Sequence, residues 1–165
     1  MKTFVINEDT VLRFAERKDV PIIFDFIRGL AEYEHLSDQV EASEDVLEKY
    51  IFDEQKVEVL ICEYKTKPVG FALYFHNFST FLGRPGIYIE DIFVYPEYRG
   101  KGIGKAILKT IASIVVDRNY GRLEWACLDW NEPSIEFYKK QGAIPMDEWT
   151  TYRVTGDNLI KLAKN

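Results

Sequence analysis

The stretch EYRGKGIGKA, residues 97–106, combines three glycines at alternating positions with basic side chains. Apolar residues at helical spacing follow it and predict a helix from about residue 102 to residue 118. The N–H groups at a helix N-terminus are unpaired and carry partial positive charge, and glycines let an anion approach them closely. The spacing therefore indicates a phosphate-binding turn.

The spacing excludes two common phosphate loops. A P-loop requires GxxxxGK[ST], but Ala106 follows the GK pair and Arg99 stands where the first glycine belongs. A dinucleotide-binding GxGxxG loop would need its third glycine at Lys105 or at Ile107. The pattern that remains is R-x-x-G-x-G over residues 99–104, after a predicted strand and at the start of a predicted helix.

Two adjacent carboxylates interrupt the β-favouring run IYIEDIFV, residues 87–94. An unpaired charge is costly in a buried strand, so Glu90 is a candidate general base. Asp91 would point to the opposite face of a regular strand. A structural salt bridge is the alternative role for either residue.

The elements that must position these residues follow from hydrophobic periodicity and turn signals. Strands are predicted at residues 3–6, 57–64, 69–78, 87–94, 122–128 and 149–154. Helices are predicted from Asp19, as N-cap, to about residue 33, from the N-cap Ser43, at about 102–118, from DWNEPS to near Gly142, and over DNLIKLA. The pattern predicts an α/β (α+β) fold in one domain over residues 1–165, with helices on both faces of a mixed sheet.

Composition narrows the function. The chain has 165 residues and a net charge of −6, and residues 32–63 hold 11 acids against Lys49 and Lys56. This balance argues against nucleic acid as a partner and permits a cationic ligand. No apolar run could span a membrane or act as a signal peptide, so a cytoplasmic protein is expected. Cys62 and Cys127 lack metal-ligand spacing, so we expect reduced thiols and no metal.

Three longer segments carry a family resemblance. The R-x-x-G-x-G turn resembles the coenzyme A loop of the GNAT acetyltransferase superfamily. LAEYE (30–34), YIEDIFVYPEYRGKGIG (88–104) and WNEPSIEFYKKQGA (130–143) resemble the diamine (spermidine/spermine) N-acetyltransferase family. The resemblance implies a GNAT fold with one mixed, mostly antiparallel sheet of about six to seven strands. It also implies acetyl-CoA as co-substrate and a homodimer.

The same resemblance assigns residues to acetyl-CoA. The pyrophosphate is expected on Arg99, Gly100, Lys101, Gly102, Ile103, Gly104 and Lys105. The backbone of Ile92, Phe93 and Val94 is expected to pair with the pantetheine arm like an added strand. Asn131, Pro133 and Ser134 of the WNEPS segment complete the coenzyme site, although Asn131 is also a good helix cap.

For the reaction, the resemblance implies direct acetyl transfer in a ternary complex. Tyr138 would be the general acid on the coenzyme thiolate, and Glu90 the water-assisted general base. Tyr33 and Glu34 match the family's substrate-binding pair, and an aromatic ring beside a carboxylate suits a cation. The resemblance also implies a bulge in this strand, so that Glu90 and Asp91 need not separate onto opposite faces, and both are expected to contribute to the same substrate site.

The acceptor is expected to be a polyamine or diamine. The alternatives are thialysine, another lysine-like amino acid, or a peptide N-terminus; a non-catalytic acyl-CoA-binding sensor is a further alternative. Two segments depart from the family pattern: TFLGRPG offers Phe81 where a tryptophan is usual, and Glu148 of PMDEWTTYRV is only a loose match.

Overall fold

The structure is a computed structural model that describes residues 3–164. The chain divides into two compact units, of which the first ends at Ala126 and the second begins at Cys127. The sheet and the first three α-helices belong to the first unit. The second unit holds the remaining two α-helices, α4 (Glu132–Lys140) and α5 (Gly156–Lys164).

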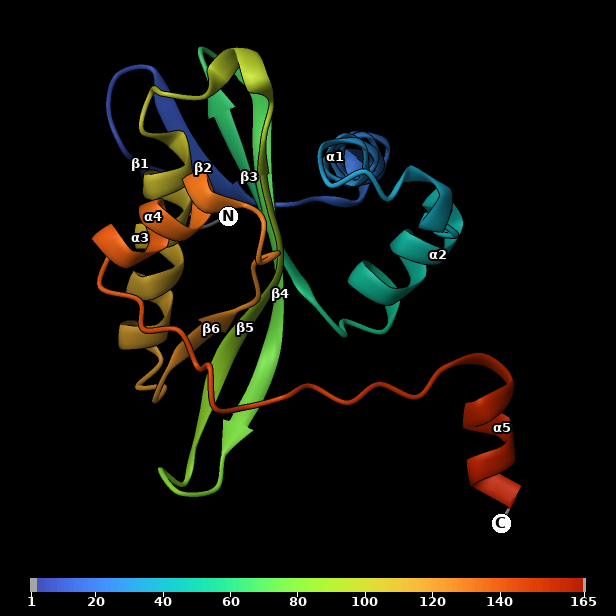
Figure 1. The fold of residues 1–165 in the computed structure, drawn as a ribbon. Coiled ribbons are helices and arrows are strands. Elements are labelled where there is room, and N and C mark those ends of the chain that lie inside the picture. The colour runs from blue at the N-terminus through green and yellow to red at the C-terminus, as the bar shows by residue number, and fades with distance from the viewer. Residues whose placement is uncertain (1–2, 165) are drawn as a thin grey trace. The chain divides into compact units, whose positions relative to one another are not determined.

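Within residues 3–164, six strands form one mixed sheet in the order of the chain (Figure 1). They are β1 (Thr3–Val5), β2 (Thr10–Phe14), β3 (Glu58–Tyr64), β4 (Lys67–Ser79), β5 (Arg84–Val94) and β6 (Leu123–Trp125). Neighbouring strands are antiparallel except β5 and β6, which are parallel. The predicted mixed, mostly antiparallel sheet is confirmed.

Helices cover both faces of this sheet. Figure 1 shows α1 (Val20–Tyr33) and α2 (Glu44–Glu48) on one face and α3 (Ile103–Asp117) on the other. Aromatic side chains pack between α1 and the sheet: the rings of Phe26 and Phe71 are stacked, with their centres 5.2 Å apart. Burying one such side chain stabilises the fold by about 2–3 kcal/mol. This packing holds α1 against its face of the sheet.

The sequence analysis missed one strand and predicted one that does not form. β2 was not predicted, because Arg13 interrupts its short apolar alternation. Residues 149–154 were predicted as a strand but form none, and Trp149 and Tyr152 are 78% and 91% exposed. A strand needs a neighbour for its N–H and C=O groups, and no strand in the described residues pairs with this segment. A β-favouring composition alone does not supply that neighbour.

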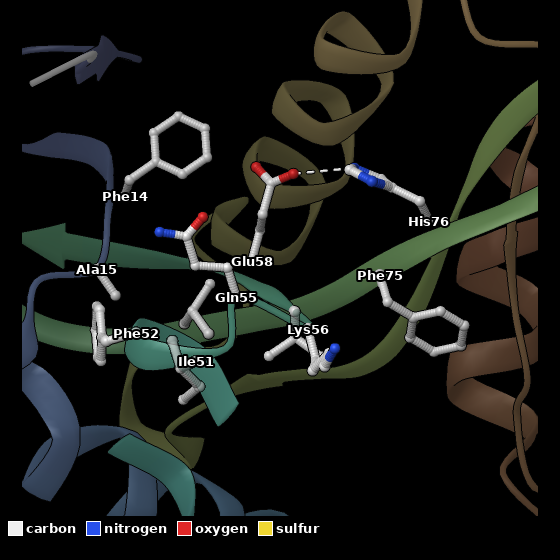
Figure 2. Close-up of a pocket in the computed structure, with 11 residues that line it drawn as sticks. Phe14, Ala15, Ile51, Phe52, Gln55, Lys56, Glu58, Phe75 and His76 are labelled. Atoms are coloured by element: carbon white, nitrogen blue, oxygen red, sulfur yellow. Dashed lines mark ion pairs between the residues drawn. The ribbon is translucent and has the colours of Figure 1, made fainter. Parts of the chain in front are cut away.

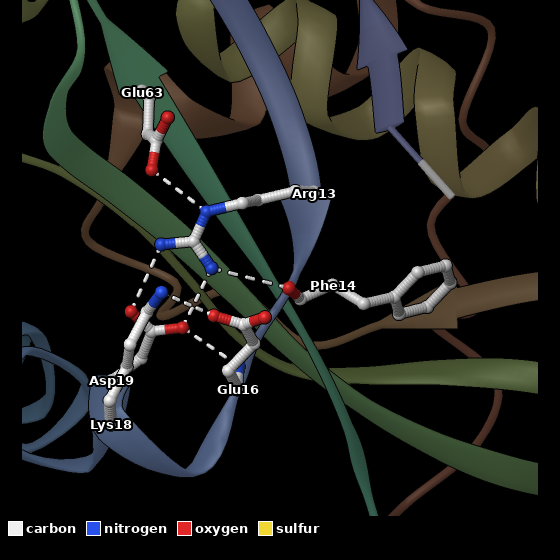
Figure 3. A network of polar contacts seen from close by, with 6 residues as sticks. All are labelled: Arg13, Phe14, Glu16, Lys18, Asp19 and Glu63. Carbon is white, nitrogen blue, oxygen red and sulfur yellow. Dashed lines mark hydrogen bonds and ion pairs between the residues drawn. The ribbon is translucent and has the colours of Figure 1, made fainter. Parts of the chain in front are cut away.

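A partly buried ion-pair network joins β2, β3 and the start of α1 (Figure 3). Arg13 Nη1 and Nη2 donate to the two carboxylate oxygens of Asp19 at 2.7 and 2.9 Å, and Arg13 Nε donates to Glu63 Oε1 at 2.8 Å. The backbone N–H of Glu16 donates to Asp19 Oδ2 at 2.7 Å. Asp19 precedes α1 as predicted, but its carboxylate binds this network instead of capping the helix.

The charge state of Asp19 depends on these contacts. Burial would raise the pKa of Asp19, but the hydrogen bonds from Arg13 and from the Glu16 amide hold it below the ordinary value. A lowered folded-state pKa means that the stabilisation is complete above the ordinary aspartate pKa of about 4 and is lost as the pH falls below it.

We expect Asp19→Asn to lower the free energy of unfolding by about 3 kcal/mol at pH 7, because Arg13 loses a buried partner. The difference from the wild type should shrink as the pH falls below about 4, where Asp19 itself becomes protonated. Urea unfolding at several pH values measures both effects. Asp25→Asn, at an exposed position of α1, is the matched control. Equal losses in both variants at pH 7 would contradict the role given to the network.

Candidate active site

β5 contains one residue more than β4 can pair. Leu73 pairs with Asp91 and Tyr74 pairs with Ile89, so that Glu90 has no partner in β4. Such a bulge bends the strand and redirects side chains. Glu90 is exposed and Asp91 is half-buried. The predicted burial of Glu90 is therefore wrong, and Asp91 is the less exposed of the two carboxylates.

β5 also loses its other neighbour at this point. The pairing of β5 with β6 runs from Ile87 to Ile89 and ends there. Beyond Glu90, the edge of β5 that faces away from β4 pairs with no strand of residues 3–164. This free edge contains Ile92, Phe93 and Val94, where an extended ligand could add its own amides.

The glycine turn has the backbone that the anion site requires. Gly100 and Gly102 have φ of +77° and +78°, and Gly102 is the N-cap of α3. Main-chain hydrogen bonds run from Arg99 N to Pro96 O and from Ala106 N to Gly102 O. Within the described part of the chain, the N–H groups of residues 100–105 have no acceptor. They are therefore available to a phosphate group.

The space in front of this turn is open. A Cβ atom added to Gly100, Gly102 or Gly104 would meet no atom within 4 Å. Gly100 and Gly102 are required by their positive φ, but Gly104 has no such conformation and no packing that excludes a side chain. A glycine there leaves the helix N-terminus accessible, and this fits a diphosphate placed on the backbone.

Arg99 turns away from the glycine amides. Its Nε donates to Val94 O at 3.0 Å, and its guanidinium lies 4.5 Å from the ring centre of Tyr33 and 5.6 Å from that of Phe93. The predicted coenzyme residue Arg99 thus contacts the predicted substrate residue Tyr33. The guanidinium of Arg99 therefore already occupies the cation–π position on the Tyr33 ring. The ammonium group of a bound amine would have to be held by the nearby carboxylates instead.

Three of the predicted carboxylates influence one another. Burial, followed by the negative charges of Glu90 and Glu34, raises the pKa of Asp91 to about 6. Burial also raises the pKa of Glu34, which caps the C-terminus of α1. The fold therefore brings the end of α1 to the bulge in β5. The resulting acidic group suits an ammonium ion, and Asp91 titrates where a proton acceptor is useful.

The remaining predicted residues belong to the second unit. Asn131 is the N-cap of α4, and its Oδ1 accepts a hydrogen bond from Ser134 N at 3.4 Å. Pro133 lies in the first turn, and Tyr138 follows Phe137 with their ring centres 5.3 Å apart. The capping role of Asn131 is confirmed. A catalytic role for Tyr138 stays a prediction.

A cavity of about 440 Å³ lies elsewhere in the first unit (Figure 2). Its lining includes Phe52, Phe75, Glu58 and His76 but none of the predicted site residues. Arg118 binds both oxygens of Glu58 at 2.7 and 2.8 Å, and His76 Nε2 lies 3.0 Å from Glu58 Oε1. Burial would raise the pKa of Glu58, but Arg118 and His76 lower it overall. This carboxylate is already satisfied and is a poor proton acceptor.

The sequence analysis missed the aromatic residues that border the glycine turn. Tyr98 lies in the short 3₁₀ helix η4 (Pro96–Tyr98), and its ring meets that of Tyr64 edge-on at 5.9 Å. Tyr64 ends β3, about 35 residues earlier in the chain. Only the pairing of β3 with β4 and of β4 with β5 brings the two together, so no local signal could have revealed the contact.

Other parts of the described chain bear on the sequence expectations. Within residues 3–164, no cluster of three His, Cys, Asp or Glu side chains is arranged to hold a metal, and no helix there is long and apolar enough to cross a membrane. Burial raises the pKa of the Cys62 thiol to about 12, and Cys127 is a half-buried free cysteine. Phe81 and Glu148 are exposed.

Comparisons with known proteins agree with this geometry. The model of the acetyltransferase (GNAT) family matches residues 24–143. Thialysine N-epsilon-acetyltransferase of Bos taurus is 40% identical over 93% of this chain and 96% of its own length. L-ornithine N5-acetyltransferase NATA1 of Arabidopsis thaliana is 31% identical over 93% of this chain and 87% of its own length. The solved structure of integron cassette protein VCH_CASS6 from the mobile metagenome of V. cholerae superimposes with a TM-score of 0.80 at 30% identity, covering 96% and 100% of the two chains.

The open space at Gly104 leads to a test of the anion site. Gly104→Val should weaken acetyl-CoA binding about tenfold, because a branched side chain would crowd a group seated on the helix N-terminus. Its melting temperature should hardly change, since a Cβ at this position has no atom within 4 Å and the side chain would point into open space. Gly104→Ala is the matched control and should bind almost normally. Calorimetric titration gives the affinities, and unchanged binding by Gly104→Val would place the coenzyme elsewhere.

Proposed function

The chain belongs to the acetyltransferase (GNAT) family, and we propose that it transfers the acetyl group of acetyl-CoA to the side-chain amine of a lysine-like amino acid. The observation that carries this proposal is the acidic group formed by Glu34, Glu90 and Asp91 next to the glycine turn. Arg99, at the start of the turn, contacts Tyr33, which precedes Glu34. A cation-attracting group close to an anion-binding turn is what an amine acceptor and a nucleotide-bearing donor require. The N-acetyltransferase assignment itself follows from the family.

The proposed acceptor differs from the one that the sequence analysis favoured. The sequence analysis favoured a polyamine or diamine and kept thialysine as an alternative. The relatives support that alternative better, because the bovine protein is named for thialysine and the Arabidopsis protein for ornithine. Both compounds are amino acids that end in a primary amine. We therefore place lysine-like amino acids first and keep polyamines as the second candidate.

The chain offers two features that would hold the coenzyme. The N–H groups of residues 100–105 would bind its diphosphate, and the free edge of β5 at residues 92–94 would orient the pantetheine arm. When bound, acetyl-CoA supplies an acetyl group activated as a thioester. A backbone N–H of the β5 edge would polarise its carbonyl group.

The carboxylates would prepare the acceptor amine. An alkylammonium has a pKa of about 10.4 and must lose a proton before it can attack. Asp91 is the better proton acceptor near neutral pH, because its pKa is raised to about 6. Glu90 is exposed at the bulge and would pass the proton to water. The role predicted for Glu90 thus becomes a role shared with Asp91, while Glu34 holds the ammonium.

Direct transfer remains the proposed route. Cys62 is buried, and its raised pKa leaves almost no thiolate to accept an acetyl group. Tyr138 remains our proposed acid for the departing coenzyme thiolate, since a phenol can donate its proton to a thiolate. A homodimer remains a proposal that rests on the family resemblance, and a cytoplasmic location remains a proposal from the sequence alone.

The acceptor preference can be measured with a panel of amines. Mixing the purified protein with acetyl-CoA should release free thiol fastest with thialysine, lysine or ornithine, and more slowly with spermidine, spermine or putrescine. Norleucine, which lacks the side-chain amine, is the matched control and should release none above background. A preference for spermidine would reinstate the polyamine prediction. Tight coenzyme binding without turnover on any amine would favour the sensor alternative.

The shared role of the two carboxylates predicts distinct pH profiles. The wild-type kcat/KM for the amine should fall as the pH is lowered through about 6, where Asp91 becomes protonated. Asp91→Asn should lower kcat/KM about a hundredfold. Glu90→Gln should move the acidic limb to lower pH, because removing one negative neighbour lowers the pKa of Asp91. Glu97→Gln, at an exposed position after β5, is the control. An Asp91→Asn variant with near-normal kcat/KM would remove Asp91 from the mechanism.

A further inference from the structure

Two lysines lie against the same tyrosine ring beside the glycine turn. The Nζ atoms of Lys65 and Lys101 are 5.6 and 5.5 Å from the ring centre of Tyr64. The ring of Tyr98 meets Tyr64 edge-on at 5.9 Å and comes from η4, which leads into the glycine turn. The β3–β4 hairpin and the glycine turn are therefore neighbours, and all these residues belong to the first unit.

The hairpin holds Lys65 firmly at its main chain. Its two turn residues, Lys65 and Thr66, have φ of +50° and +67°, as in a tight two-residue hairpin. Lys65 N donates to Asp9 O at 2.7 Å, and the preceding Tyr64 pairs with both Thr10 and Lys67. The backbone is thus fixed on two sides, and the exposed side chain can reach toward the glycine turn.

Two positive charges lie at one tyrosine ring, although the whole chain carries a net charge of −6. Each ammonium gains a modest cation–π attraction from Tyr64, but the two like charges repel each other. Lys65 has one acidic neighbour, Asp9 Oδ2 at 4.0 Å, and exposed pairs of this kind contribute little. Lys101 forms no ion pair within residues 3–164. An anionic group between the two lysines would relieve the repulsion.

We propose that Lys65 and Lys101, which both contact the ring of Tyr64, bind the 3′-phosphate monoester of coenzyme A. The inference rests on the proposed function, because it assumes that the diphosphate occupies the N–H groups of residues 100–105. Coenzyme A carries a second, separate phosphate on its ribose, close to the diphosphate. Lys101 lies within the turn itself, so a coenzyme seated there brings this second phosphate to the lysine pair. Recognition of that phosphate distinguishes the coenzyme from forms that lack it.

Calorimetric titration with acetyl-CoA and with acetyl-dephospho-CoA tests this subsite. The wild type should bind acetyl-CoA more tightly than the dephospho form. Lys65→Ala should weaken acetyl-CoA binding about fivefold and leave the dephospho form unchanged, as expected for one exposed ion pair with phosphate. Lys109→Ala removes the same charge from an exposed position of α3 and should alter neither affinity.

Other outcomes separate this inference from the proposed function. Equal wild-type affinity for the two coenzymes, or equal weakening of both by Lys65→Ala, would overturn the 3′-phosphate subsite while leaving the acetyltransferase proposal intact. A wild type that binds neither coenzyme would overturn the proposed function, and the subsite with it.

Discussion

One unpaired residue in β5 determines where a ligand can enter this fold. At Glu90 the register with β4 slips, and the pairing with β6 has already ended at Ile89. A β-strand that keeps both neighbours has no free backbone groups, whereas β5 beyond this point keeps only one. The same slip leaves Glu90 exposed and Asp91 half-buried on the strand that leads to the glycine turn. Free backbone and reactive side chains therefore arise from a single local irregularity.

The end of α1 reaches this irregularity because the start of α1 is held in place. Arg13 and Asp19 join β2 to the beginning of the helix, and the Phe26–Phe71 stack holds its middle against the sheet. Fourteen helical residues later, Tyr33 and Glu34 lie near β5. Arg99 then connects this helix end to the carbonyl of Val94 and to the glycine turn. Substrate-side and coenzyme-side residues are thus parts of one packed arrangement, in which a shift of α1 would alter both.

Negative charge gathers at the bulge in β5, and positive charge gathers at the glycine turn that follows β5. Burial, together with the negative charges of Glu90 and Glu34, raises the pKa of Asp91, while the glycine turn offers unpaired N–H groups and Lys101. Neither the carboxylates nor the glycine turn stabilise the fold by themselves, since like charges and unpaired N–H donors both cost free energy. A cationic acceptor and an anionic donor would offset both costs at once. Such an arrangement of charges is typical of functional sites.

The sequence by itself determined the elements that depend on local periodicity. It predicted α1, α3, the hairpin of β3 and β4, the glycine turn and the Asn131 cap, because apolar spacing and capping preferences act over a few residues. It could not predict β2 or the unpaired segment 149–154, since strand formation depends on a distant neighbour. The family motifs pointed to Glu90, Asp91, Glu34 and Tyr33 as site residues. Only the tertiary structure decided that Glu90 is exposed, that Asp91 is the perturbed acid and that Arg99 lies on Tyr33. Those properties depend on strand register and on charges brought together across the fold, and a linear pattern records neither.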